Sequence, residues 1–100
     1  LRISRDSSGC MEKRFRAVIR GEVQGVGFRY FLRREALRLG LFGFAKNEPD
    51  GSVCAEAQGE EKNLEIFLEL CRKGPSFSSV GGVFTEEIPL VAEAADFVVE

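Results

Sequence analysis

The sequence predicts an α+β domain of the ferredoxin-like class, a split βαβ sandwich with the element order βαββαβ. Two stretches with apolar residues at helical spacing each follow a strand-like stretch. A dense cluster of turn residues separates two further strand-like runs. The chain has 100 residues, which is enough for one hydrophobic core. We therefore expect an antiparallel sheet with both helices packed on one face, and a short terminal strand besides.

The first strand and the first helix come from residues 13–40. Alternate residues are apolar from Lys13 to Arg20, which is typical of a half-buried strand. The opposite face of this strand carries arginines, which we expect to be solvent-exposed: Arg14, Arg16 and Arg20. Apolar residues then recur every three or four positions between Phe28 and Leu39, and this pattern predicts a helix. Gly40 occupies the position where a glycine commonly ends a helix.

The second half of the chain combines strand-like runs with one more helical pattern. The expected strands are short apolar runs bounded by turn residues: 41–46, 51–58, 79–87 and 97–99. Residues 60–73 carry an apolar stripe at helical spacing, and Gly74-Pro75 terminates that helix. The pair Gly81-Gly82 predicts a bulge or bend in its strand.

The composition excludes several functional classes. The formal net charge of −2 argues against a general attraction to nucleic acid or to anionic membranes. No apolar run reaches the roughly 20 residues that span a bilayer, so we expect a cytoplasmic protein without a membrane partner. The three cysteines (Cys10, Cys54 and Cys71) have no metal-binding spacing, and the last two are expected to fill the core. The chain contains no histidine, which removes histidine-dependent catalysis and the commonest metal ligand.

The amino-terminal residues differ in character from the rest of the chain. They are polar, contain Ser7-Ser8-Gly9 and show no periodicity. We interpret residues 1–12 as a disordered tail or a remnant of cloning, and residues 13–100 as the folded domain.

Residues 21–29 (GEVQGVGFR) form a glycine-rich turn between the first strand and the first helix. Glycine adopts positive φ easily, so backbone N–H groups can converge on one point in such a turn. The start of a helix adds free N–H donors and a partial positive charge. Arg29 would add a full charge with a geometry suited to phosphate. Since most such turns are only connections, a second group is needed to support a binding site.

Asn47 is that second group. The first turn lies at one end of the predicted sheet, and the second strand runs back toward that end. Asn47 closes the second strand, so we expect it near Arg29 although the two are 47 − 29 = 18 positions apart. Glu48 and Asp50 are expected to serve the turn that follows.

These residues closely resemble the acylphosphatase family. Residues 21–29 resemble its phosphate loop, and Arg29 stands in the place of the family's essential arginine. Residues 43–47 (GFAKN) with Asp50-Gly51 resemble its second signature, in which Asn47 matches the essential asparagine. The resemblance covers residues 14–100. Phe44-Ala45 replaces a more usual Trp-Val pair, which alters core volume but removes no catalytic group.

The resemblance implies hydrolysis of acyl phosphates to a carboxylate and inorganic phosphate. Arg29 and Asn47 are then the catalytic residues. The phosphate-binding residues form one continuous loop: Gln24, Gly25, Val26, Gly27, Phe28 and Arg29. No metal and no cofactor is expected. The expected partners are a small-molecule acyl phosphate and inorganic phosphate, with no nucleic acid, and we expect a monomer.

Two alternatives share this fold. RNA-recognition modules have the same topology, but their aromatic signature belongs on the third strand. Here Phe42 and Phe44 fall on the second strand, where burial is the simpler explanation. Hydrogenase-maturation carbamoyltransferases begin with a similar domain, for which carbamoyl phosphate would be the ligand. In that group a proline usually follows the Phe-Arg pair, whereas this chain has Tyr30.

Overall fold

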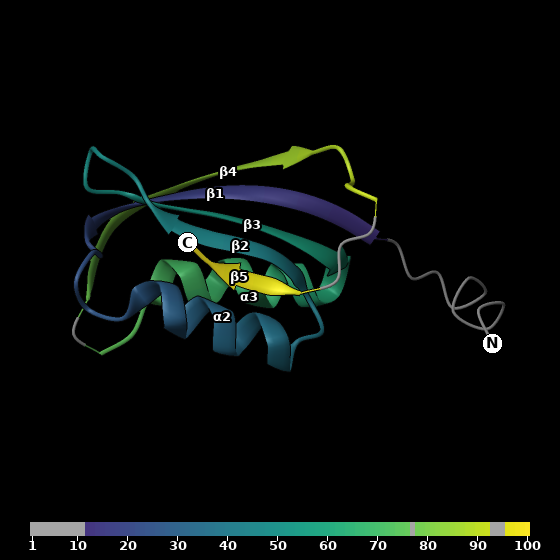
Figure 1. Cartoon of the computed structure of the whole chain (residues 1–100), viewed down its shortest axis with the longest axis horizontal. Coiled ribbons are helices and arrows are strands. Elements are labelled where there is room, and N and C mark those ends of the chain that lie inside the picture. Colours follow the sequence, from purple (N-terminus) through teal and green to yellow (C-terminus); the bar gives the residue numbers. More distant parts are fainter. Residues whose placement is uncertain (1–11, 77, 93–95) are drawn as a thin grey trace, which may run out of the picture.

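The computed structural model describes residues 12–76, 78–92 and 96–100. Its elements are β1 (Glu12–Glu22), α2 (Phe28–Arg38), β2 (Phe42–Asn47), β3 (Val53–Glu60), α3 (Glu61–Lys73), β4 (Ser79–Ile88) and β5 (Phe97–Val99). The strands form one sheet in the order β4-β1-β3-β2-β5. Both helices lie on the same face of this sheet (Figure 1). The predicted ferredoxin-like α+β class is therefore confirmed.

Strand β5 gives the sheet a mixed character. Strands β1 to β4 pair antiparallel, as expected, whereas β5 runs parallel to β2 with Gly43 opposite Phe97 and Ala45 opposite Val99. The ladder continues to the end of the chain, since the Glu100 N–H donates to the Ala45 carbonyl at 2.9 Å. β5 therefore carries the last residues to the same end of the sheet at which β2 ends (Figure 1).

Helix α2 ends as its sequence predicts. Gly40 adopts a left-handed φ of 72°, which lets the chain leave the helix axis. The Leu41 N–H then bonds the Ala36 carbonyl at 2.8 Å, and the Gly40 N–H bonds the Leu37 carbonyl at 3.1 Å. These two bonds form a Schellman motif, which satisfies carbonyl groups in the last turn.

The hydrophobic core fills the space between the sheet and the helices. Its largest members come from both layers and include Phe28, Phe67 and Phe97. Cys71 is part of this core, and burial raises the pKa of its thiol to about 12. Cys54 on β3 is also buried, but it lies on the sheet face away from the helices. Its neighbours there are Val18 on β1 and Lys46 on β2. Cys10 lies outside the described residues.

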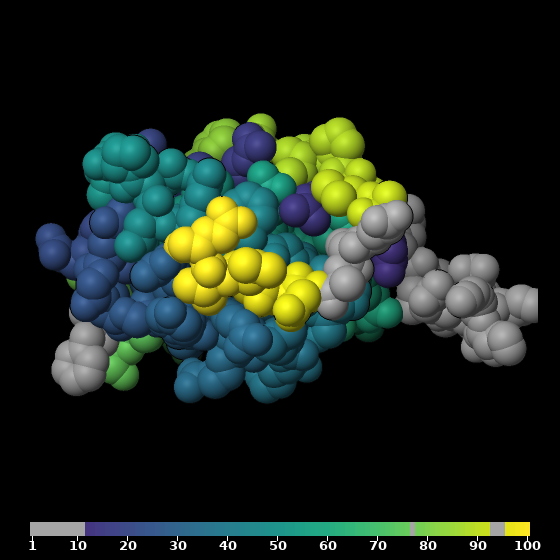
Figure 2. All heavy atoms as spheres, in the orientation of Figure 1, coloured from purple at the N-terminus to yellow at the C-terminus, as the bar shows by residue number. Residues whose placement is uncertain are grey.

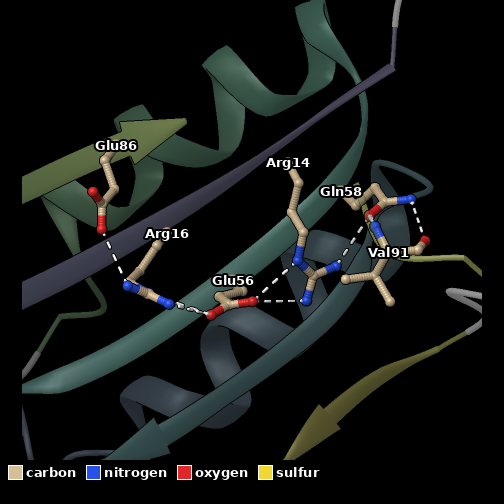
Figure 3. A network of polar contacts seen from close by, with 6 residues as sticks. All are labelled: Arg14, Arg16, Glu56, Gln58, Glu86 and Val91. Atoms are coloured by element: carbon tan, nitrogen blue, oxygen red, sulfur yellow. Dashed lines mark hydrogen bonds and ion pairs between the residues drawn. The ribbon is translucent and has the colours of Figure 1, made fainter. Parts of the chain in front are cut away.

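The sheet face opposite the helices holds a network of charges (Figure 3). Arg14 is only 5% exposed, so the expectation of solvent exposure is wrong for this residue. Its Nε donates to Glu56 at 3.0 Å and its Nη1 to Gln58 at 3.2 Å. Arg16 joins the network through Glu56 and Glu86. The buried guanidinium of Arg14 is therefore paired with the largely buried Glu56 and with the buried Gln58, and such pairing is the condition under which a charge can be buried.

Three further expectations concern the same sheet. Phe42 and Phe44 lie on this open face and are half-buried rather than buried. The predicted bulge is confirmed, since Arg20 faces Gly82 and Gly21 faces Val80, which leaves Gly81 as the extra residue. At the amino terminus, Glu12 already belongs to β1, while residues 1–11 lie outside the described part of the chain.

Within the described residues, no helix is both long and apolar enough to cross a membrane.

Gly43 is a position where the fold requires glycine. It has a φ of 152°, and an added Cβ would lie 1.9 Å from the carbonyl oxygen of Glu56 on the neighbouring strand. Because main-chain atoms cannot move aside, we expect Gly43→Ala to lower the free energy of unfolding by about 2–4 kcal/mol in urea denaturation. Gly82→Ala is the control, since a Cβ there meets no described atom within 4 Å. Equal stability of the two variants would contradict this view.

Candidate active site

The loop between β1 and α2 is built on glycine conformations. Gly25 and Gly27 have left-handed φ values of 78° and 77°, and Gly27 is the N-cap residue of α2. Val23 and Phe28 are buried at the two ends of this loop and anchor it in the core. Among the residues that the structure describes, no side chain caps the amino terminus of α2. The N–H groups of the first helical turn therefore remain available to an anion or to water.

Arg29 follows in the first turn of α2 and is half-buried. Its Nη1 donates to the main-chain oxygen of Glu100, and its guanidinium carbon lies 5.8 Å from the centre of the Tyr30 ring. One turn later, Arg33 Nε donates to the Phe97 carbonyl at 3.1 Å. Figure 2 shows the last residues of the chain (yellow) on the surface beside α2 (blue). The side chain of Arg29 is thus directed toward the end of β5.

Asn47 is the last residue of β2 and is exposed. Ala45 points into the core, so alternation along the strand places Asn47 on the helix side and Lys46 on the open face. Ala45 pairs with Val99. Glu100, to which Arg29 donates, therefore stands beside the end of β2, close to Asn47 in the ladder. The structure brings the elements that carry Arg29 and Asn47 to the same end of the sheet (Figure 1).

A direct link joins the glycine-rich loop to the turn after Asn47. Gln24 Nε2 donates to the Glu48 carbonyl and to the Ser52 carbonyl, both at 2.8 Å. Sequence reasoning identified Gln24 as a loop residue but missed this role of its side chain. It also missed the contact between Arg29 and Glu100. Both contacts join residues far apart in the sequence, and no local pattern encodes them.

The turn itself is held by Asp50, as expected. Its Oδ1 accepts from the Ser52 N–H at 2.9 Å and from the Ser52 hydroxyl at 2.6 Å. Arg20 forms an ion pair with the same carboxylate at 3.1 Å. The bonds from Ser52, followed by those from Arg20, lower the pKa of Asp50. This carboxylate therefore stays ionised and structural at neutral pH. Among the described residues, no cluster of three or more histidine, cysteine or acidic side chains could hold a metal ion.

The fold and this loop define a class of protein. It is a small α+β domain of the ferredoxin-like class. Its glycine-rich turn leads into an uncapped helix, and such a backbone is suited to binding an anion. The acylphosphatase family model matches residues 15–99, and this chain belongs to the acylphosphatase family.

Individual relatives agree with the family assignment. An acylphosphatase of Rhizobium etli is 48% identical over 82 residues, which are 82% of this chain and 87% of that protein. The crystal structure of acylphosphatase from Bacillus subtilis superposes with a TM-score of 0.84 at 37% identity, covering 90% of this chain and 99% of that one. Full-length HypF in its phosphate- and nucleotide-bound form gives a TM-score of 0.79 at 30% identity, covering 91% of this chain but only 12% of HypF.

Proposed function

We propose that this chain is an acylphosphatase that hydrolyses the carboxyl–phosphate bond of acyl phosphates. The products are a carboxylate and inorganic phosphate. The family membership and the relatives named acylphosphatase support this activity. The observation that carries the proposal is the uncapped turn at the start of α2, with Arg29 in it and the end of β2 beside it.

In this proposal, the loop holds the phosphate group. The main-chain N–H groups from Gln24 to Phe28 bind its oxygens, and the guanidinium of Arg29 adds a bidentate contact. Arg29 gives up its contact with Glu100 for the substrate. Negative charge on the equatorial phosphate oxygens is then stabilised by donors that are already oriented, which is the largest catalytic effect available to such a site.

Asn47 orients the attacking water in this proposal. Its side-chain carbonyl accepts a hydrogen bond from the water and directs the water oxygen at phosphorus, in line with the leaving group. The bond from the water oxygen to phosphorus forms, and the bond from phosphorus to the carboxyl oxygen breaks with its electron pair. The carboxylate departs, and the proton of the water passes to a phosphate oxygen.

The chemistry explains why histidine can be absent. A carboxylate is a good leaving group with a pKa of about 4, so it needs no proton from a general acid. The substrate's own phosphate takes the proton that a base would otherwise remove. The proposed mechanism therefore depends on position and fixed charge, and it uses no metal or cofactor.

The test is hydrolysis of benzoyl phosphate with a chelator present. We expect turnover well above the spontaneous rate, with KM in the range of about 1 μM to 1 mM that is usual for enzymes. In water labelled with ¹⁸O, the label should enter inorganic phosphate, because attack occurs at phosphorus. Label in benzoate, or decay at the spontaneous rate, would overturn the proposal.

A second candidate follows from the similarity to HypF. In that case the chain would be an acylphosphatase-like domain acting on carbamoyl phosphate as part of a larger maturation protein. The same assay with carbamoyl phosphate separates the two. The proposed enzyme should show the higher kcat/KM with benzoyl phosphate, and the reverse order would favour the second candidate.

We also propose a monomeric, cytoplasmic protein that binds no nucleic acid. The support is the net charge of −2 and the small, self-contained core. Gel filtration with light scattering tests the first point, and an RNA titration at low salt tests the last. A dimer at micromolar concentration, or salt-sensitive RNA binding, would each refute the corresponding statement.

A further inference from the structure

The side chain of Gln24 connects the proposed phosphate loop to the turn that follows Asn47. The proposed reaction requires a fixed distance between these two segments. Gln24 is half-buried in the β1–α2 loop, and its amide donates to the carbonyls of Glu48 and Ser52 at 2.8 Å each. The Ser52 carbonyl also accepts the Glu48 N–H at 2.8 Å. These carbonyls are the two sides of the turn that starts directly after Asn47.

Both N–H groups of the Gln24 amide are used in this contact. A primary amide has two donor hydrogens, and each of them is directed at a main-chain carbonyl. The side chain therefore has no donor left for a phosphate oxygen. Its main-chain N–H is unaffected and stays part of the proposed phosphate loop. The side chain and the main chain of Gln24 thus have separate tasks.

Asn47 lies at the end of β2, directly before the turn that Gln24 binds. The Asn47 side chain is exposed at the end of β2. Its main chain is held on one side by β3, where Asn47 pairs with Val53, and Gln24 binds the next residue, Glu48, from the side of the loop. We propose that Gln24 is a positioning residue, which fixes the distance between the phosphate loop and Asn47 and thereby the line of attack of the water. This inference rests on the proposed function.

The test separates positioning from binding. Gln24→Met keeps the length of the side chain but removes both donors. In the assay with benzoyl phosphate, kcat should fall about 10- to 100-fold, because in-line attack is sensitive to displacements of about 1 Å. KM and the Ki of inorganic phosphate should stay within about twofold, because the main-chain donors of the loop remain.

Gln58→Met is the matched control. Gln58 also makes two hydrogen bonds to main chain, with the Val91 N–H at 2.9 Å and the Val91 carbonyl at 3.1 Å (Figure 3). It pairs with Arg14 in the β1–β3 ladder, at the end of the sheet remote from the loop. Gln58 also accepts a hydrogen bond from the buried Arg14, so this variant should lose at least as much stability as Gln24→Met and keep the kcat of the wild-type chain. Comparable losses of kcat in both variants would show a general effect of destabilisation and overturn the inference.

Gln24→Glu gives a second, independent readout. Ionised glutamate has only acceptors and faces two carbonyl oxygens, so activity should be low at neutral pH. Protonation restores one donor, and kcat relative to wild type should rise as the pH falls through the pKa of this glutamate. A flat ratio across the pH range would overturn the inference.

The outcomes distinguish this inference from the proposed function. A wild-type chain without turnover would refute the proposed function itself. An active wild-type chain with an equally active Gln24→Met variant would refute only the positioning role. A variant in which kcat is unchanged but phosphate binding is lost would instead assign the side chain to the phosphate loop.

Discussion

Replacing Arg29 with alanine is expected to lower kcat/KM for benzoyl phosphate by about 10³-fold or more. The guanidinium is the full positive charge within the proposed loop, and the developing charge of the transition state has no substitute for it. The Ki of inorganic phosphate should rise as well, because phosphate uses the same contact. The fold should persist, since the hydrogen bond that this side chain makes within the described part of the chain goes to Glu100, the last residue. Steady-state kinetics and far-UV circular dichroism measure these effects.

Arg33→Ala is the control for charge and for the attachment of β5. Arg33 lies one turn further along α2 and donates to the main chain of Phe97 at 3.1 Å, much as Arg29 does to Glu100. It is outside the proposed loop, so kcat/KM should change by less than about fivefold. If both variants lost activity to the same extent, Arg29 would act by holding β5 in place and not by binding phosphate. Equal affinity of wild type and Arg29→Ala for phosphate would contradict the proposed loop.

Replacing Asn47 with alanine should lower kcat by about 10²- to 10³-fold, with little change in the Ki of inorganic phosphate. In the proposed mechanism, the amide orients the water and does not contact the bound phosphate. This separation of kcat from phosphate affinity distinguishes Asn47 from Arg29. Steady-state kinetics and inhibition by inorganic phosphate, measured on the same preparation, give kcat and Ki.

Asn63→Ala is the matched control for this substitution. The Asn63 side chain donates to the Leu39 carbonyl at 3.0 Å and thereby joins α3 to the end of α2. Its loss should cost about 1 kcal/mol of stability and leave kcat unchanged. An Asn47→Ala variant with wild-type kcat would exclude the water-orienting role.

The elements of the fold follow from local patterns, and their order was therefore predictable. The period of the first helix, the terminating Gly40 and the turn around Asp50 are all local features. The parallel pairing of β5 is not local. This strand has three residues, and its place beside β2 depends on a chain crossing from one sheet edge to the other.

The burial of Arg14 also could not be predicted from local patterns. Alternation correctly places its side chain on the sheet face away from the helices, but it cannot show that a partner covers it. That partner is Glu56, 42 residues later in the sequence. Charged residues are mostly exposed, and pairing is what permits the exception. Arg16 pairs with the same carboxylate, but its side chain stays 41% exposed, so the position of an arginine on the sheet, as well as its pairing, decides whether it is buried.

The residues of the candidate site were predictable from the sequence, but the contacts of Gln24 and Arg29 were not. The glycines, Arg29 and Asn47 follow from turn chemistry, strand order and family resemblance. Their role in catalysis remains a prediction. The hydrogen bonds of Gln24 and the contact of Arg29 with Glu100 depend on three-dimensional placement alone. A glutamine in a glycine-rich loop gives no sign of which carbonyls it will reach.

A titration with inorganic phosphate, followed by the amide chemical shifts of the ¹⁵N-labelled chain, tests the central claim most directly. The main-chain amides of residues 24–29 should shift together, with one dissociation constant. The start of α3 is an internal control, because Glu61 in its first turn repels anions. Shifts confined to the loop are the predicted result. Shifts at α3 equal to those at the loop, or no saturable shift at residues 24–29, would contradict the assignment of this loop as the phosphate site.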